Sequence, residues 1–217
     1  PLMATDHIGR RRSWRYLALL VLFAVLFGGW SWLWYFAVGK AQIAIDGWRE
    51  RENQSGRIYT CGEQSIGGYP FRIEVNCDNA SALFRSNNPP LEIKSTGILV
   101  AAQIYDPTLL ISEFHGPLTV ADPGQAPQFV VNWKLAQSSL RGTPKSPERG
   151  SLIVDRPVVD RMNGGNAQHV LQARRIELHG RIAEGSAANN PVIEVVLRLD
   201  HASAPVVHPA AETPVDA

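Results

Sequence analysis

Two patterns of hydrophobic positions divide this chain of 217 residues. Residues 16–38 form one uncharged, mostly apolar run, and from residue 56 onward apolar and polar residues alternate in short stretches. A helix over the first run would be about 35 Å long, enough to cross about 30 Å of bilayer hydrocarbon. The first pattern therefore predicts a transmembrane helix, and the second predicts strands with one buried face.

Charged and aromatic residues at the two ends of the apolar run indicate its orientation. Only Lys40 follows the run closely, whereas four basic residues precede it: Arg10, Arg11, Arg12 and Arg15. The positive-inside rule places residues 1–15 in the cytoplasm as a basic tail, and the rest of the chain beyond the membrane. Aromatic rings near the far end suit the outer headgroup layer, and these belong to Trp30, Trp32, Trp34 and Tyr35.

A cleaved signal peptide is the alternative to an anchor, because Ala37, Val38 and Gly39 form a small-x-small triplet. The apolar run is about twice as long as a signal core, which favours an uncleaved anchor. Both alternatives export residues 41–217, which hold 16 of the Lys and Arg residues and 19 of the Asp and Glu residues. Nucleic-acid binding needs a clustered positive face, so we expect no nucleic-acid partner.

The exported part is expected to form a short helix followed by one β domain. The helix is predicted over residues 39–55 and the β domain over residues 56–200, while the Ala- and Pro-rich tail, 201–217, is expected to be disordered. About nine short strands follow one another, and no strong amphipathic helix interrupts them. This series predicts a mainly antiparallel sheet that is curved or sandwich-like, with an open groove as one form.

Some strands can be placed more closely from their patterns. Residues 98–105 are apolar on both faces, which is typical of a central strand. Residues 109–114 and 118–121 are predicted to pair as a hairpin, and residues 141–150 to form a loop. A shift in the apolar phase at Arg174 and Arg175 predicts a bulge, where the two arginines are exposed or bind an anionic headgroup.

The two cysteines lie in the clearest alternation of the chain. Ile73, Val75 and Cys77 point to one face of a strand, and a turn near Tyr69 would place Cys61 opposite Cys77. Export puts both thiols in an oxidising compartment. We therefore predict a Cys61–Cys77 disulfide worth about 3 kcal/mol, with two buried free thiols as the alternative.

The sequence holds no recognisable catalytic or metal-binding motif. The histidines do not have HExxH spacing, the cysteines are not in CxxC form, and GxSxG, Walker and GxGxxG patterns are missing. Two pairs of acid–base residues lie close together, Glu113 with His115 and Asp155 with Asp160, but nothing marks them above other pairs. We expect no metal, no cofactor and no enzymatic activity.

The motif between the cysteines carries a family resemblance. It consists of Gly68, Tyr69, Pro70, Phe71 and Arg72, flanked by Cys61 and Cys77. With the Arg-rich tail, the single span and a Trp soon after it, the motif resembles a bacterial envelope family, chiefly alphaproteobacterial, known as domain of unknown function twenty-one twenty-five. Residues 171–207 are similar to the middle region of that family. The resemblance implies location and architecture but no reaction.

Two functions fit these expectations. The first is a non-catalytic periplasmic β domain, anchored in the inner membrane, whose one-sided strands form a groove for lipid or another apolar ligand. The candidate lining residues are Phe71, Ile73, Val75, Trp133, Ile193 and Leu197. Anchored β-groove proteins of envelope lipid traffic are similar in outline, at the level of fold only. The second is a protein-interaction adapter for an inner-membrane complex, which buries the same residues and uses its edge strands.

Overall fold

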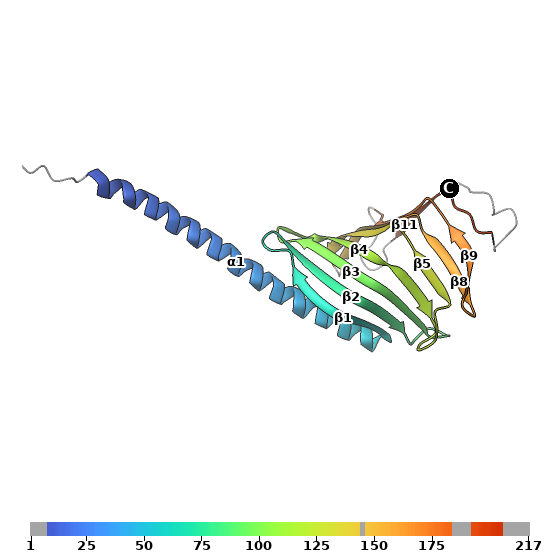
Figure 1. The fold of residues 1–217 in the computed structure, drawn as a ribbon. Coiled ribbons are helices and arrows are strands. Elements are labelled where there is room, and N and C mark those ends of the chain that lie inside the picture. The colour runs from blue at the N-terminus through green and yellow to red at the C-terminus, as the bar shows by residue number, and fades with distance from the viewer. Residues whose placement is uncertain (1–7, 144–145, 184–191, 206–217) are drawn as a thin grey trace, which may run out of the picture.

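One long helix leads into a single antiparallel sheet. The computed structural model describes residues 8–143, 146–183 and 192–205. Figure 1 shows an open, curved sheet with α1 (Ile8–Gln54) lying along its first strand. The strands are β1 (Arg57–Gly67), β2 (Arg72–Phe84), β3 (Leu91–Gln103), β4 (Asp106–Ala121), β5 (Phe129–Asn132), β6 (Leu135–Thr143), β7 (Ser146–Asp155), β8 (Val158–Asn163), β9 (Asn166–Gln172), β10 (Arg175–Ile182) and β11 (Ile193–Asp200). The predicted fold class is confirmed.

Helix α1 is continuous through both predicted helical segments. It passes from the apolar run into residues 39–54 without a break, since no proline interrupts the sequence. It ends where Gly56 adopts a φ of 77°, a left-handed conformation that glycine tolerates best. The backbone amide of Gly56 then donates to the carbonyl oxygen of Asn53 at 3.0 Å. By length and composition, α1 is apolar enough to cross a membrane.

The sheet is a meander in which every pairing is antiparallel. The main path runs β1-β2-β3-β4-β6-β7-β10-β11, while β5, β8 and β9 form a second branch. The branches separate at β4, because residues 109–114 of this strand pair with β6 and residues 118–120 pair with β5. Each hairpin therefore lies beside the one before it, and strands pair close to where they occur in the chain.

The two branches are the two halves of longer strands. Only two residues separate β5 from β6, β7 from β8, and β9 from β10. These interruptions lie side by side, because the amides of Lys134, Arg156 and Arg174 donate to the carbonyl oxygens of Asp155, Arg174 and Asp200, each at 2.9 Å. We call the line that these interruptions form across the sheet the fold line. It also passes through Asn79 in β2 and residues 96–97 in β3.

Backbone conformation and side-chain size both mark the fold line. Asn79, Arg156 and His201 have φ values of 52°, 50° and 49°, in the left-handed region that non-glycine residues seldom adopt. The buried residues beside them are small: Ala80, Ala136, Ala173 and Ser203. Small side chains leave room for the strands to change direction closely, so the two halves of the sheet meet over them.

The fold line explains where the predicted strand pattern was wrong. Residues 109–114 and 118–121 do not pair as a hairpin, because they are two parts of β4 on either side of Gly116. The sequence marks a turn there, but the chain continues in the same direction. The predicted loop over residues 141–150 is also wrong, since β6 extends to Thr143 and β7 starts at Ser146; residues 144–145 lie outside the described residues.

The predicted central strand, bulge and tail can each be compared with the structure. Residues 98–103 belong to β3, which lies between β2 and β4 in the sheet order. The phase shift at Arg174 coincides with the interruption between β9 and β10. The first residues of the expected tail are held in place, because Ser203 and Gln172 exchange two backbone hydrogen bonds of 2.8 and 3.0 Å. Residues 206–217 lie outside the described part of the chain.

Candidate functional site

One face of the sheet is mainly apolar from β1 to β11. Residues opposite each other in antiparallel strands point to the same face, so the pairing registers define rows across the sheet. One row runs through Ile66, Val75, Val100, Ser112, Ser138, Leu152, Leu178 and Leu197. The next runs through Gln64, Cys77, Ile98, Phe114, Ala136, Val154, Ile176 and Leu199. We call this surface the apolar face.

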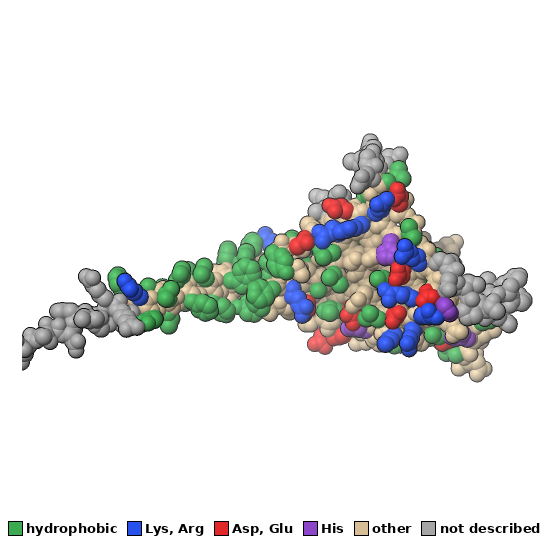
Figure 2. Space-filling view, turned by 90° about the horizontal axis from the view of Figure 1, so that it is seen from above, with side chains coloured by type: hydrophobic (Ala, Val, Ile, Leu, Met, Phe, Trp, Pro, Cys, Tyr) green, Lys and Arg blue, Asp and Glu red, His purple; other side chains and the backbone are tan. Residues whose placement is uncertain are grey.

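The opposite face carries the charges, and we call it the polar face. Its rows alternate with those above, and one of them runs through Asn76, Leu99, Glu113, Gln137, Ile153, Glu177 and Arg198. Beyond the fold line another runs through Thr60, Ser81, Lys94, Thr119, Val130, Asp160 and His169. Figure 2 shows charged and histidine side chains spread over one side of the sheet, whereas the helix is covered mainly by hydrophobic ones.

No second layer covers the apolar face within the described residues. None of their large side chains is fully buried, and the only helix among them lies along β1. On β11 the apolar-face residues Ile193, Val195 and Leu197 are 64%, 62% and 55% exposed. Side chains of this kind are normally buried, so this surface is the candidate site among the described residues.

The structure brings four of the six predicted lining residues onto the apolar face. The registers place Ile73, Val75, Ile193 and Leu197 there. Trp133 lies on the fold line, where its indole nitrogen donates to the carbonyl oxygen of Phe114 at 2.9 Å. A methyl group on Gly116 would come within 3.3 Å of the Trp133 ring, so this glycine leaves room for it. Phe71 lies in the turn before β2 and packs against the helix instead.

The predicted disulfide is present, in a different register from the one expected. Cys61 and Cys77 are bonded, with their Cα atoms 5.5 Å apart. However, Cys61 lies opposite Ala80 and Gln64 lies opposite Cys77, so the expected register was wrong by three residues. The left-handed Asn79 changes the direction of β2 between the two rows. The bond therefore joins the two sides of the fold line on the apolar face, where a regular ladder would keep the sulfurs apart.

The family motif forms a tight turn. Gly68 has a φ of 95°, and a Cβ there would be 2.7 Å from the carbonyl oxygen of Arg72. The backbone amide of Arg72 donates to the Gly68 carbonyl at 3.1 Å and closes the turn. Gly68 is therefore required by geometry, and the turn presents Tyr69, Pro70 and Phe71 at the end of the β1–β2 hairpin. We call these three residues the hairpin tip.

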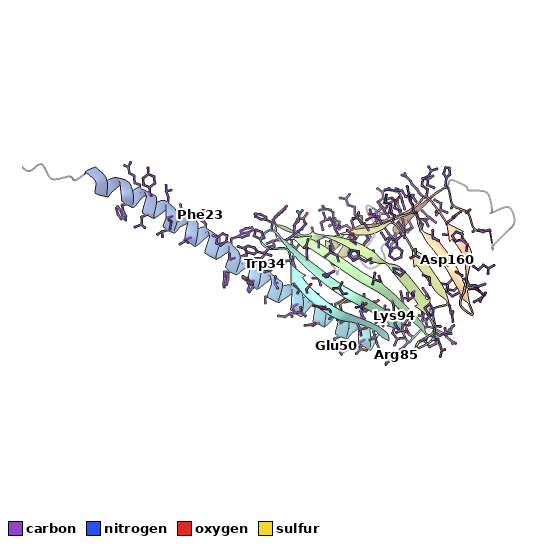
Figure 3. The ribbon with its side chains drawn as sticks, in the orientation of Figure 1. Phe23, Trp34, Glu50, Arg85, Lys94 and Asp160 are labelled. Carbon is purple, nitrogen blue, oxygen red and sulfur yellow. A yellow bond between two sulfur atoms is a disulfide. The ribbon has the colours of Figure 1, made fainter. Side chains whose placement is uncertain are left out.

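The hairpin tip is bonded to the helix. The indole nitrogens of Trp30 and Trp34 donate to the carbonyl oxygens of Pro70 and Arg72, each at 2.9 Å, and the hydroxyls of Ser31 and Tyr69 are 2.8 Å apart. Trp34, labelled in Figure 3 where α1 reaches the sheet, is only 6% exposed. The sequence pattern predicts a membrane belt for these tryptophans but not their contact with the hairpin tip, for which the aromatic residues of both segments were the available signal.

The helix stays on β1 beyond the hairpin tip. The Trp48 and Tyr59 rings lie 4.7 Å apart, and the Arg49 guanidinium donates to the side-chain oxygen of Gln64 at 2.6 Å. From Trp34 to Gln54 the helix rises about 30 Å. The sheet is therefore held along this length of the helix rather than hinged at one point.

Charged residues of the polar face pair with one another. The Asp160 carboxylate is 2.9 Å from His169, while Asp155 lies 3.9 Å from Arg175 rather than forming an acid pair with Asp160. Glu113 and His115 are 3.6 Å apart. The arginine pair is also engaged in ion pairs, Arg174 with Asp200 at 3.4 Å and Arg175 with Glu177 at 2.6 Å. No three His, Cys, Asp or Glu residues converge as metal ligands in the described part of the chain.

Three carboxylates among the described residues have lowered pKa values. The hydrogen bond from Arg175, helped by His179, lowers the pKa of Glu177, and the hydroxyl of Thr108 lowers the pKa of Asp106. The hydrogen bond from Arg57 lowers the pKa of Glu52. These partners stabilise partly exposed carboxylates in the charged form, so none of the three is prepared as a proton donor.

The fold and its apolar face define a class of protein: an open antiparallel sheet behind one apolar helix. No curated protein and no solved structure gives a match to the chain. A family model, described as an uncharacterized protein conserved in bacteria (DUF2125), matches residues 34–217. The chain belongs to this family. The match covers the hairpin tip, both cysteines and every strand.

Proposed function

We propose that this protein is a membrane-anchored domain that holds the acyl chains of a lipid against its sheet. The carrying observation is the apolar face, which extends from Ile66 on β1 to Leu197 on β11 and is covered by described residues only along β1, where α1 lies. Acyl chains suit such a surface, because burying apolar area from water is favourable at about 25 cal/mol per Å² and needs no precise partner geometry.

The proposal places the protein in the bacterial inner membrane with the sheet in the periplasm. The four arginines before the apolar run support a cytoplasmic amino terminus. The Cys61–Cys77 bond supports an oxidising compartment for the sheet. The continuity of α1 supports a fixed connection between the membrane and the sheet.

The test compares two neighbouring substitutions on β11. Leu197→Asp puts a charge on the apolar face, and Val196→Asp puts the same charge on the polar face; the two side chains are similarly exposed, at 55% and 51%. The full chain would be purified from membranes in mild detergent and examined by native mass spectrometry. We expect bound lipid in the wild type and in Val196→Asp, and loss of lipid in Leu197→Asp.

Absence of co-purified lipid from all three proteins would contradict the proposal, as would equal lipid content in the two variants. Circular dichroism would verify that both variants fold. A radioactive or fluorescent phospholipid added to delipidated protein would separate weak binding from none.

An adapter for a membrane protein complex is the second candidate, and the edge of β11 favours it. One long edge of β11 pairs with β10, and the other has no partner strand in the described residues. Its Val196 is exposed although it lies on the polar face. An exposed apolar edge is suited to pairing with a strand of another protein. Crosslinking from Arg198→Cys on this edge would recover a defined membrane protein if this function is correct.

A further inference from the structure

The helix divides into a free part and a part that holds the sheet. Residues 14–29 are exposed all around, whereas Trp30 and Ser31 are partly covered and Trp34 is buried by the hairpin tip. Figure 3 shows the division, with Phe23 on the free part and Trp34 where the sheet begins. Only the free part can be surrounded by lipid on every side.

The free part is too short to cross a bilayer. From residue 14 to residue 29 a helix rises about 22 Å, against about 30 Å of hydrocarbon. Arg15 and the arginines before it limit the span at the amino-terminal end of the helix, because charged side chains avoid hydrocarbon. Tilting the helix would further reduce the thickness of bilayer that the free part crosses. About 8 Å of hydrocarbon must therefore surround the helix from Trp30 onward. That is the level of the hairpin tip.

The backbone hydrogen bonds of the hairpin tip suit an apolar environment. Backbone carbonyls without partners are costly in hydrocarbon. The carbonyl oxygens of Pro70 and Arg72 accept hydrogen bonds from the two indoles, and that of Phe71 accepts one from the amide of Ile104 at 3.1 Å. Three successive carbonyl groups at the end of the sheet are therefore satisfied by the protein itself.

Exposed aromatic rings surround this end of the sheet. Phe71 is 61% exposed, although its ring also contacts Trp30, with the centroids 6.1 Å apart. Tyr105, in the turn between β3 and β4, is 71% exposed and lies next to the residue that hydrogen-bonds Phe71. Tyrosine and tryptophan favour the boundary between acyl chains and headgroups, where one end of the ring is apolar and the other polar.

We propose that the hairpin tip and Tyr105 are inserted in the membrane that α1 crosses, in the leaflet on the side of the sheet. The inserted surface is continuous with the span through Trp30 and Trp34. The partner is the lipid bilayer itself, at its acyl–headgroup boundary. The apolar face then starts in the leaflet, since Ile73 and its neighbour across the sheet, Ala102, lie directly beside these turns.

This insertion deepens the proposed function, because it gives lipid a route from the leaflet to the sheet. It depends on the helix spanning a membrane but not on lipid binding by the apolar face. The opposite end of the sheet, where Gln125 lies between β4 and β5, would stand farther from the membrane than the hairpin tip and Tyr105.

The experiment measures the depth of single labelled cysteines. Tyr105→Cys and the control Gln125→Cys lie in exposed turns at opposite ends of the sheet. Each full-length variant would be labelled with an NBD fluorophore without reductant, so that the Cys61–Cys77 bond stays intact. Both would then be reconstituted in phosphatidylethanolamine and phosphatidylglycerol vesicles that contain doxyl-labelled phosphatidylcholine. We expect strong quenching and a blue-shifted emission at position 105, and the emission of a water-exposed dye at position 125.

Equal quenching at the two positions in folded protein would overturn the insertion. Phe71→Cys provides a second inserted site, with circular dichroism as the check on folding. Quenching at position 105 without lipid bound to the purified protein would leave the insertion standing and contradict the lipid-holding function. Lipid bound to the purified protein together with a water-exposed label at position 105 would support the lipid-holding function and contradict the insertion.

Discussion

The two faces of the sheet are made from alternate residues of the same strands, yet they differ in what they contact. The polar face is occupied by its own ion pairs, such as Arg72 with Glu74 at 2.7 Å and Arg181 with Glu194 at 2.6 Å. The apolar face has the disulfide and rows of aliphatic side chains, but no covering layer in the described residues. The charges of one face are therefore paired within the protein, whereas most aliphatic side chains of the other are left without cover by the described residues.

The largest expected effect comes from removing the crosslink of the apolar face. Replacing both Cys61 and Cys77 with Ser should lower the free energy of unfolding by about 3 kcal/mol, because the unfolded chain gains freedom. Urea unfolding followed by tryptophan fluorescence would measure it. Reduced wild-type protein is the control and should show the same loss; an unchanged unfolding midpoint after reduction would contradict the prediction.

A smaller effect is expected from one charge placed on each face of β3. Val100→Lys puts an ammonium among the aliphatic residues of the apolar face and should cost about 2 kcal/mol. Leu99→Lys, its neighbour, lies opposite Glu113 on the polar face and should cost less than about 0.5 kcal/mol. Urea midpoints of the two variants give the comparison, and equal costs would show that the faces do not differ in environment.

The fold line allows a third test at Asn79. Asn79→Val should cost about 1–2 kcal/mol, because a β-branched residue is disfavoured at a φ of 52°. Asn79→Gly is the matched variant and should unfold close to the wild type, since glycine accepts this conformation. Thermal unfolding would measure both. A stable Val variant would mean that the chain bends elsewhere.

The smallest effect is expected from the ion pairs of the polar face. Because its pKa is lowered by Arg175, Glu177 contributes stability above its ordinary pKa of 4.5, and this contribution is lost as the pH falls through the lowered value. Glu177→Gln should therefore unfold slightly more easily than the wild type at pH 7, with the difference disappearing in acid. A difference that grows toward acid pH would contradict this assignment.

Periodicity and residue chemistry were sufficient to predict the long apolar helix, the antiparallel sheet and the disulfide. They placed Ile73, Val75, Ile193 and Leu197 on one face, because alternation fixes the face wherever a strand is regular. They did not predict the fold line, because turn residues such as Gly116 in mid-strand resemble those that end a strand. The register of Cys61 depends on the left-handed Asn79, and no local pattern indicates that conformation.

The meander has a consequence for how large such a domain can become. Because every strand pairs with one close to it in the chain, another hairpin could be added beside the last without rearranging those before it. Each added strand would widen the sheet by about 4.8 Å and lengthen every row by one residue. The number of side chains in each row of the apolar face is therefore set by a simple count of hairpins.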